Sequence, residues 1–214
     1  MKFIWCILFI CVLFGGINGK GFSRSRKGDV LYENKLYGFT INRPKDWYVA
    51  SPAELSHLIQ IASSLMESHK HKFSHVLSNW SVENITPLFG FSKYPLNATG
   101  GQLNPNILSM TENLNAYRNV KNPCDYFDVN QEILKTLAMG MKFIGTCQNV
   151  NINGENFKTH SIQTKFPNFP LIKQTFYAKI VKDNQLFLVL LTYFNRNSKT
   201  QLENIMKTLK FTKN

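Results

Sequence analysis

One stretch near the end of the chain limits the folds that this sequence can adopt. The segment from Leu186 to Phe194, LFLVLLTYF, is apolar at almost every position. A strand that is apolar on both faces must be covered on both faces, because apolar surface is unfavourable in water. The sequence therefore predicts a β-sheet in which this strand is buried between two layers.

Two hairpins are predicted around this strand. One turns at Asp183-Asn184, after a strand that alternates apolar and polar residues. Its apolar positions are expected on the inner face of the sheet: Phe176, Ala178 and Ile180. The other hairpin covers residues 141–166 and turns at Asn153-Gly154, a strong signal for a tight turn.

Three amphipathic helices are expected. The first begins with a capping box formed by Ser51 and Glu54, with Pro52 at the first helical position. The second covers about 126–140 and begins at Asp125 or Asp128. The third repeats the capping-box pattern at Ser198 and Gln201 near the end of the chain.

Helices that cover both faces of a mostly antiparallel central sheet define an α+β fold of the α/β/α sandwich type. No break in composition divides the chain after its first residues. We therefore expect one domain over 29–214, preceded by a basic flexible arm over 20–28 and a signal peptide over 1–19.

The first residues have the pattern of a secretory signal. Lys2 precedes the uncharged run from Phe3 to Phe14, about half the roughly 20 residues that a membrane span needs. Small residues follow as far as Gly19, where cleavage is simplest. The alternative is an uncleaved anchor, because the positive charges of 20–27 resist translocation. On the first interpretation the mature chain has no transmembrane span and is periplasmic or extracellular.

The chain is basic, with 25 Lys and Arg against 13 Asp and Glu and a net charge of +12. Part of the excess lies in KGFSRSRK, residues 20–27, and the rest is dispersed. Dispersed positive charge favours solubility and weak attraction to anionic surfaces. Neither a zinc-finger nor an RNA-recognition pattern is present, so we expect no nucleic-acid partner.

Two cysteines, Cys124 and Cys147, follow the leader. An even pair in an exported chain predicts a disulfide. A helix over 126–140 would rise about 22 Å, and a strand over 141–147 would return about 23 Å. The two sulfur atoms would then meet at the same end of this unit. The alternative is a reactive thiol at Cys124 with a pKa lowered by the helix start.

Three motifs together resemble a known family. They are YGFTINRPKDW from Tyr37, SKYP followed by NPNILSMTENL, and a closing hairpin QTFYAKIVKDNQLFLVLLTYF before a helix that ends in LKF. This pattern resembles the PsbP-like family of exported α/β/α sandwich proteins, which includes small bacterial members of unassigned role. The resemblance implies that Phe39, Pro44 and Trp47 begin the sheet and pack its edge. The family's plant members assist photosystem II, but residues for that role are not found here.

The segment ESHKHKFSH contains a candidate metal site. Glu67, His71 and His75 are spaced i, i+4 and i+8, so a continuing helix would place them on one face. Imidazole and carboxylate ligands suit zinc or copper. The alternative is a solvated helix end, where histidine and lysine interact favourably with the helix dipole. No other cofactor is expected.

Loop 94–105 is long for a connection between strands, which favours a role in binding. Its candidate surface residues are Tyr94, Asn97, Gly100, Gly101 and Asn104, and we expect the basic arm over 20–28 to be the other part of the same surface. The two glycines lead into a strand rather than a lysine-bearing helix, so a phosphate-binding loop is not indicated.

No catalytic residue is predicted. The sequence has no G-x-S-x-G motif, and His160, in a strand, is expected to be a hydrogen-bonded structural histidine. The sequence therefore favours an exported, non-enzymatic binding or assembly-accessory protein with a protein partner in the envelope or outside the cell. The alternatives are a secreted factor, effector or adhesin-like, and a histidine-mediated metal carrier.

Overall fold

The computed structural model describes residues 29–67, 70–73, 75, 81–96, 103–136 and 141–212. This part of the chain contains three α-helices and ten strands. The helices are α2 (Pro52–Glu67), α3 (Pro123–Thr136) and α4 (Arg196–Met206). The strands are β1 (Asp29–Asn34), β2 (Phe39–Pro44), β3 (Tyr48–Val49), β4 (Ile85–Ser92), β5 (Asn106–Asn113), β6 (Met141–Ile152), β7 (Glu155–Thr164), β8 (Ile172–Ile180), β9 (Gln185–Tyr193) and β10 (Lys210–Phe211).

Seven strands form the larger sheet in the order β3-β4-β5-β9-β8-β7-β6. Every pairing in it is antiparallel. The apolar segment that begins at Leu186 is β9, which lies in the interior of the sheet between β5 and β8. The sequence prediction of a buried interior strand is therefore confirmed, since the residues of β9 from Leu186 to Tyr193 are all buried.

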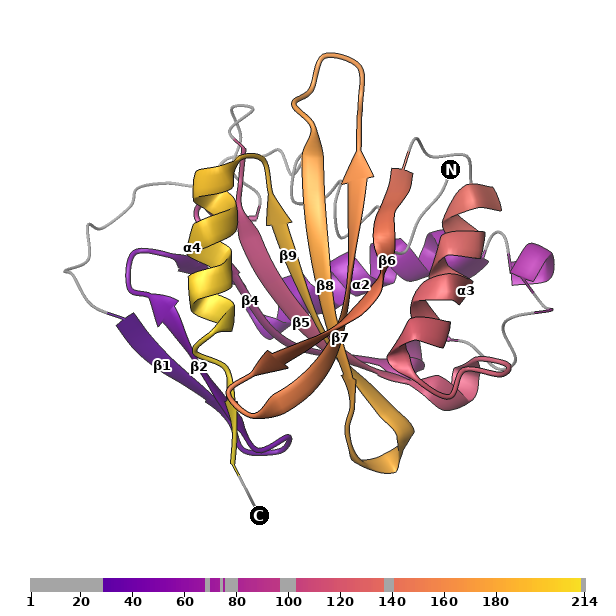
Figure 1. Cartoon of the computed structure of the whole chain (residues 1–214), viewed down its shortest axis with the longest axis horizontal. Helices are drawn as coiled ribbons and strands as arrows, with labels where there is room; N and C mark the ends of the chain where they lie inside the picture. Colours follow the sequence, from indigo (N-terminus) through magenta and orange to yellow (C-terminus); the bar gives the residue numbers. More distant parts are fainter. Residues whose placement is uncertain are drawn as a thin grey trace.

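Successive residues of β9 belong to two different hydrophobic cores. Leu186, Leu188 and Leu190 pack with apolar residues of α2 and α3. Phe187, Val189 and Leu191 pack with α4 and with the strand β2. Figure 1 shows α4 in front of the larger sheet and α2 behind it. The side chains of β9 thus pack against α2 and α3 on one face of the sheet and against α4 and β2 on the other.

A second, three-stranded sheet completes the layer that contains α4. Its order is β1-β2-β10, so the first described hairpin pairs with the end of the chain. Phe39 and Ile41 of β2 are buried, as their alternation with polar residues predicts. The backbone N–H of Thr212 donates to the carbonyl of Gly38 at 2.7 Å, which extends the contact past β10.

The first predicted capping box is confirmed, and the other two helix starts are corrected. Ser51 and Glu54 exchange hydrogen bonds at the start of α2. Helix α4 begins after Asn195, which caps the helix, and Ser198 is the residue three positions later that completes the box. The prediction that Ser198 is the cap is therefore wrong, because Asn195 supplies the capping side chain.

Helix α3 also begins earlier than predicted. Asn122 Oδ1 accepts the N–H groups of Cys124 and Asp125, and the Asp125 carboxylate accepts the N–H of Asn122. Asn122 is therefore the cap, and Pro123 is the first helical residue. Asp125, which the sequence offers as a possible start, instead occupies the third helical position, and residues 137–140 lie outside the described part.

Both predicted hairpin turns are confirmed. Asn153 and Gly154 have φ values of 52° and 87°, and Asp183 and Asn184 have φ values of 59° and 55°. Consecutive positive φ values suit tight turns between twisted antiparallel strands, and Asn, Asp and Gly adopt them most readily. The fold is thus α+β with two antiparallel sheets. None of the helices in the described ranges is long and apolar enough to cross a membrane.

Candidate functional site

The base of loop 94–105 is held by a buried amide. Asn104, which is 2% exposed, accepts the N–H of Tyr94 at 2.9 Å and donates to the carbonyls of Tyr94 and Pro95 at 3.0 and 3.3 Å. The backbone N–H of Lys93 also donates a hydrogen bond to the carbonyl of Pro105, one residue outside the Tyr94–Asn104 pair. Leu96 is buried in the core beside α2 and anchors the loop from inside. The ends of the loop are therefore fixed on the sheet.

The predicted surface residues of this loop have different environments. Tyr94 is 37% exposed and is the large side chain that the described part of the loop presents to solvent. Asn104 is buried and closes the loop rather than forming part of its surface. Asn97, Gly100 and Gly101 lie outside the described residues, so their role stays a prediction.

A row of polar side chains crosses four neighbouring strands beside the described ends of this loop. Cross-strand partners place its members opposite one another on the face that α2 and α3 cover: Ser92, Asn106, Thr192 and Gln174. Ser92 and Asn106 bond to the loop backbone at the carbonyls of Tyr94 and Asn104. We call these four residues the polar row.

The polar row contains buried acceptors that receive no donor from the described residues. Within this part of the chain, Asn106 Oδ1 and Gln174 Oε1 are buried and lack a hydrogen-bond partner, as does Thr164 Oγ1 on the next strand. The Gln174 amide nitrogen donates to Thr192 at 3.0 Å, so its oxygen is the free end. Buried polar atoms are normally paired, and such exceptions call for an explanation. A group with N–H or O–H donors would satisfy these oxygen atoms.

Sequence reasoning identified the loop but not the polar row. Its members come from β4, β5, β8 and β9, and their alignment depends on a register that no local pattern specifies. The available signal was Thr192, a polar residue that interrupts the apolar run of β9.

The proposed metal ligands are not brought together by a single helix. Helix α2 ends at Glu67, and Lys70–Phe73 forms a separate 3-10 turn. His75 instead contacts Glu132 of α3, with 2.5 Å between Nε2 and Oε1. No group of three or more His, Cys, Asp or Glu side chains suited to a metal is found among the described residues. The Glu67 side chain lies outside that description, so metal binding there stays a prediction.

A second buried polar cluster, formed by Glu112, Tyr117 and Tyr126, stabilises the fold. The Glu112 carboxylate accepts hydrogen bonds from the hydroxyls of Tyr117 and Tyr126. Burial, together with the charge of Glu112, raises the pKa of Tyr126 well above its usual value. The phenol therefore stays protonated and acts as a donor that fixes the start of α3 against β5.

His160 differs from its prediction in one respect. It is buried in β7, as expected of a structural histidine. Neither ring nitrogen has a hydrogen bond of normal geometry to a described residue, and the backbone of Gly145 is its main polar influence, so packing rather than the predicted hydrogen bonding holds the ring.

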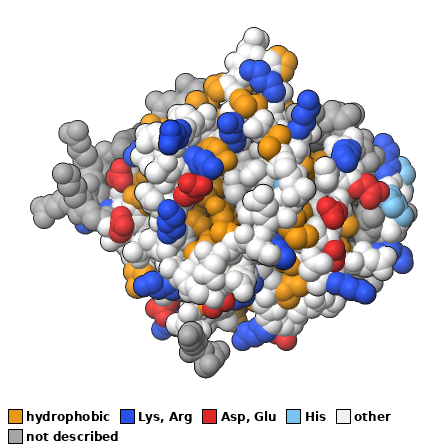
Figure 2. Space-filling view, in the orientation of Figure 1, with side chains coloured by type: hydrophobic (Ala, Val, Ile, Leu, Met, Phe, Trp, Pro, Cys, Tyr) orange, Lys and Arg blue, Asp and Glu red, His pale blue; other side chains and the backbone are white. Residues whose placement is uncertain are grey.

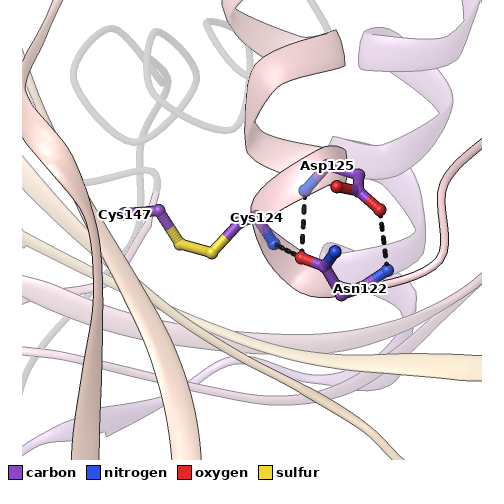
Figure 3. Close-up of a disulfide and its surroundings, with 4 residues drawn as sticks. All are labelled: Asn122, Cys124, Asp125 and Cys147. Carbon is purple, nitrogen blue, oxygen red and sulfur yellow. Dashed lines mark hydrogen bonds between the residues drawn. A yellow bond between two sulfur atoms is a disulfide. The ribbon is translucent and has the colours of Figure 1, made fainter.

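The predicted disulfide between Cys124 and Cys147 is present, with a Cα–Cα distance of 5.7 Å. It joins the first turn of α3 to a bulge in β6, where the pairing with β7 shifts between Ile144 and Gln148. Figure 3 shows the bond beside the cap formed by Asn122 and Asp125. Gly145, with a φ of 73°, supplies the left-handed residue of this bulge. The alternative of a reactive thiol at Cys124 does not apply while this bond is intact.

Charged side chains are dispersed over the face of the molecule that Figure 2 shows. On the face shown in Figure 2, lysine and arginine side chains are scattered between uncharged areas and do not merge into one patch. This distribution agrees with the dispersed charge predicted from the sequence.

No family model and no curated protein sequence matches this chain. Several solved structures are similar to it, and two of them illustrate the likeness. One is cyanobacterial PsbP (CyanoP) from Synechocystis sp. PCC 6803, with a TM-score of 0.49 and 11% identity over 91% of this chain and 98% of that one. The other is LpqN, involved in cell envelope biogenesis of Mycobacterium tuberculosis, with a TM-score of 0.42 and 12% identity over 88% and 93%. A PsbP protein is therefore among the solved structures similar to this chain.

Proposed function

We propose that this chain is an exported, non-enzymatic binding or assembly-accessory protein built on a PsbP-like α/β/α sandwich. Loop 94–105 is its binding region, and the partner is a protein in the cell envelope or outside the cell. The observation that carries this proposal is the fixed base of the loop. Asn104 binds the backbone of Tyr94, and Asn106 of the polar row binds the backbone of Asn104, so both ends of the loop are held. Binding residues are commonly found on loops that a rigid scaffold positions.

The exposed aromatic ring at the edge of this loop fits an interaction surface. Tyrosine is enriched at the energetic centres of interfaces, because a rigid ring with one polar end buries large area at a low entropy cost.

Export is supported by the disulfide and by the predicted leader. Structural disulfides persist in oxidising compartments and are rare where thiols are kept reduced. A secreted factor would share these features, and the location of the protein separates the two functions. Retention with envelope material favours the accessory function, whereas accumulation in cell-free medium favours the secreted factor.

The binding region is tested by site-specific cross-linking in the producing organism. A photoreactive amino acid replaces Tyr94 in one full-length variant and Leu36 in the control. Leu36 is 72% exposed in the turn between β1 and β2, so it is at least as accessible to chance encounters. A cross-linked species of defined mass that forms from position 94 and not from position 36 supports the proposal. Identical products from both positions, or none from position 94, contradict it.

A further inference from the structure

A groove separate from the binding loop runs between α3 and β6. It has a volume of about 320 Å³, at the lower end of the range for small-molecule pockets, roughly 300–1,000 Å³. Six residues line it: Gln131, Leu134, Lys135, Met141, Lys142 and Phe143. Strand β6 is the edge of the larger sheet, and four strands separate it from β4, where loop 94–105 begins.

The floor of the groove is apolar and continuous with the core. Leu134 and Phe143 also line a small inner pocket together with Phe127 and Phe176. Met141 packs against the same core from the rim. A ligand in this groove therefore contacts hydrocarbon and aromatic surface along its inner side, which favours an apolar body.

The charged residues of the groove are two lysines. Lys135 lies in the last turn of α3, and Lys142 is the second residue of β6. Among the described residues that line the groove, none is acidic. Neither lysine forms an ion pair with a described carboxylate, and the Glu132 carboxylate on α3 contacts His75 instead. The charge of the groove is therefore complementary to an anion.

The two elements that form the groove are tied together at the end away from it. The disulfide joins the start of α3 to the bulge of β6, and the Asn122 cap fixes the first turn of the helix. This tie limits the relative motion of α3 and β6 and so lowers the entropic cost of binding a ligand between them.

We propose that this groove binds a single-chain amphipathic anion, a fatty carboxylate whose alkyl chain lies on Leu134 and Phe143 and whose head group lies between Lys135 and Lys142. A cation of the same shape would be repelled by the two ammonium groups. A small polar anion would leave the apolar floor without contact. This site goes beyond the proposed binding loop and does not depend on it.

The proposal is tested with laurate below its micelle concentration, by calorimetry on the full chain. Dodecyltrimethylammonium carries the same chain with the opposite charge and serves as the ligand control. We expect saturable binding of one laurate and no saturable binding of the cation. The double variant Lys135→Gln/Lys142→Gln should bind laurate about five-fold more weakly or worse, because each exposed charge contributes modestly. Lys45→Gln/Lys207→Gln, which changes two exposed lysines elsewhere, should leave laurate binding unchanged.

The position of the ligand is tested independently with a spin-labelled fatty acid. Amide signals of α3 and β6 should broaden, and those of β4 and β5 should not. Equal binding of laurate and the cation, or full affinity in the groove variant, would overturn the proposal. Binding to anionic lipid vesicles without saturable binding of laurate would overturn it in favour of association with a membrane surface.

Discussion

The imidazole of His160 packs edge-on against the ring of Phe143, with 4.7 Å between the ring centroids. Phe127 of α3 contacts the same imidazole from another direction, at 5.8 Å. The side chain is 5% exposed. Burial lowers the pKa of His160 from its usual 6.5, although the backbone of Gly145 and the carboxylate of Asp128 favour the charged form.

This lowered pKa predicts that the protein loses stability as the pH falls. Well above pH 6.5 the imidazole is neutral in both the folded and the unfolded state. Below it, the unfolded chain binds a proton that the folded chain does not, so the free energy of unfolding decreases until the pH reaches the lowered pKa. One proton contributes a slope of at most about 1.4 kcal/mol per pH unit. Urea denaturation between pH 7.5 and 5.5 should show a smaller slope in His160→Phe and His160→Gln. An unchanged slope in both variants would show that another group is responsible.

The disulfide between α3 and β6 should contribute strongly to stability. Its two cysteines are 23 residues apart in the sequence. Closing a loop of this length in the unfolded chain stabilises the folded state by about 3 kcal/mol. Urea denaturation of Cys124→Ser/Cys147→Ser should show a loss of this size relative to the unaltered chain. Reductant should destabilise the unaltered chain and leave the double variant unaffected. If reductant changes neither while free thiols are labelled in the unaltered chain, the bond does not contribute as expected.

The cap of α4 gives a further stability prediction. Asn195→Ala removes the acceptor for the Ser198 N–H and should destabilise the protein by about 1 kcal/mol. Asn197→Ala is the matched control, because Asn197 is exposed two residues further along the same helix. It should be neutral, since alanine favours helix. Thermal denaturation compares the two variants. Equal stability of the two would mean that Ser198, as the sequence suggests, is the true cap.

The sequence signals that succeeded are short-range ones. Asn153-Gly154 specifies its turn through backbone preferences that need no tertiary contact. The Ser51 and Glu54 box likewise involves residues three apart, and it formed as predicted. The burial of β9 could be predicted without knowing its neighbours, because a strand that is apolar on both faces is buried on both faces.

The failures occurred where several candidates compete or where distant strands must be aligned. Asn122, Asp125 and Asp128 all have side chains suited to capping, and the start of α3 was placed at the wrong one. Burial of Tyr126 and Phe127 against the sheet fits the earlier start. The polar row depends on strand register, and the groove between α3 and β6 depends on where the helix packs. Local sequence patterns fix neither. Of the candidate site, only loop 94–105 could therefore be predicted from the sequence.

The hydrogen bonds of Asn104 give a prediction that connects stability with the proposed function. Asn104→Ala leaves the Tyr94 N–H without its acceptor and the Pro95 carbonyl without the Asn104 donor, whereas the Tyr94 carbonyl keeps the hydrogen bond from the Ser92 hydroxyl. Removing buried hydrogen-bond partners costs about 1–3 kcal/mol. Hydrogen exchange at the Tyr94 amide should accelerate, because the loop base opens more often. The photoreactive residue at position 94 should also lose its specific cross-link. Asn197→Ala again serves as the control and should retain both slow exchange and cross-linking. Unchanged exchange at Tyr94 in Asn104→Ala would show that the loop is held by other contacts.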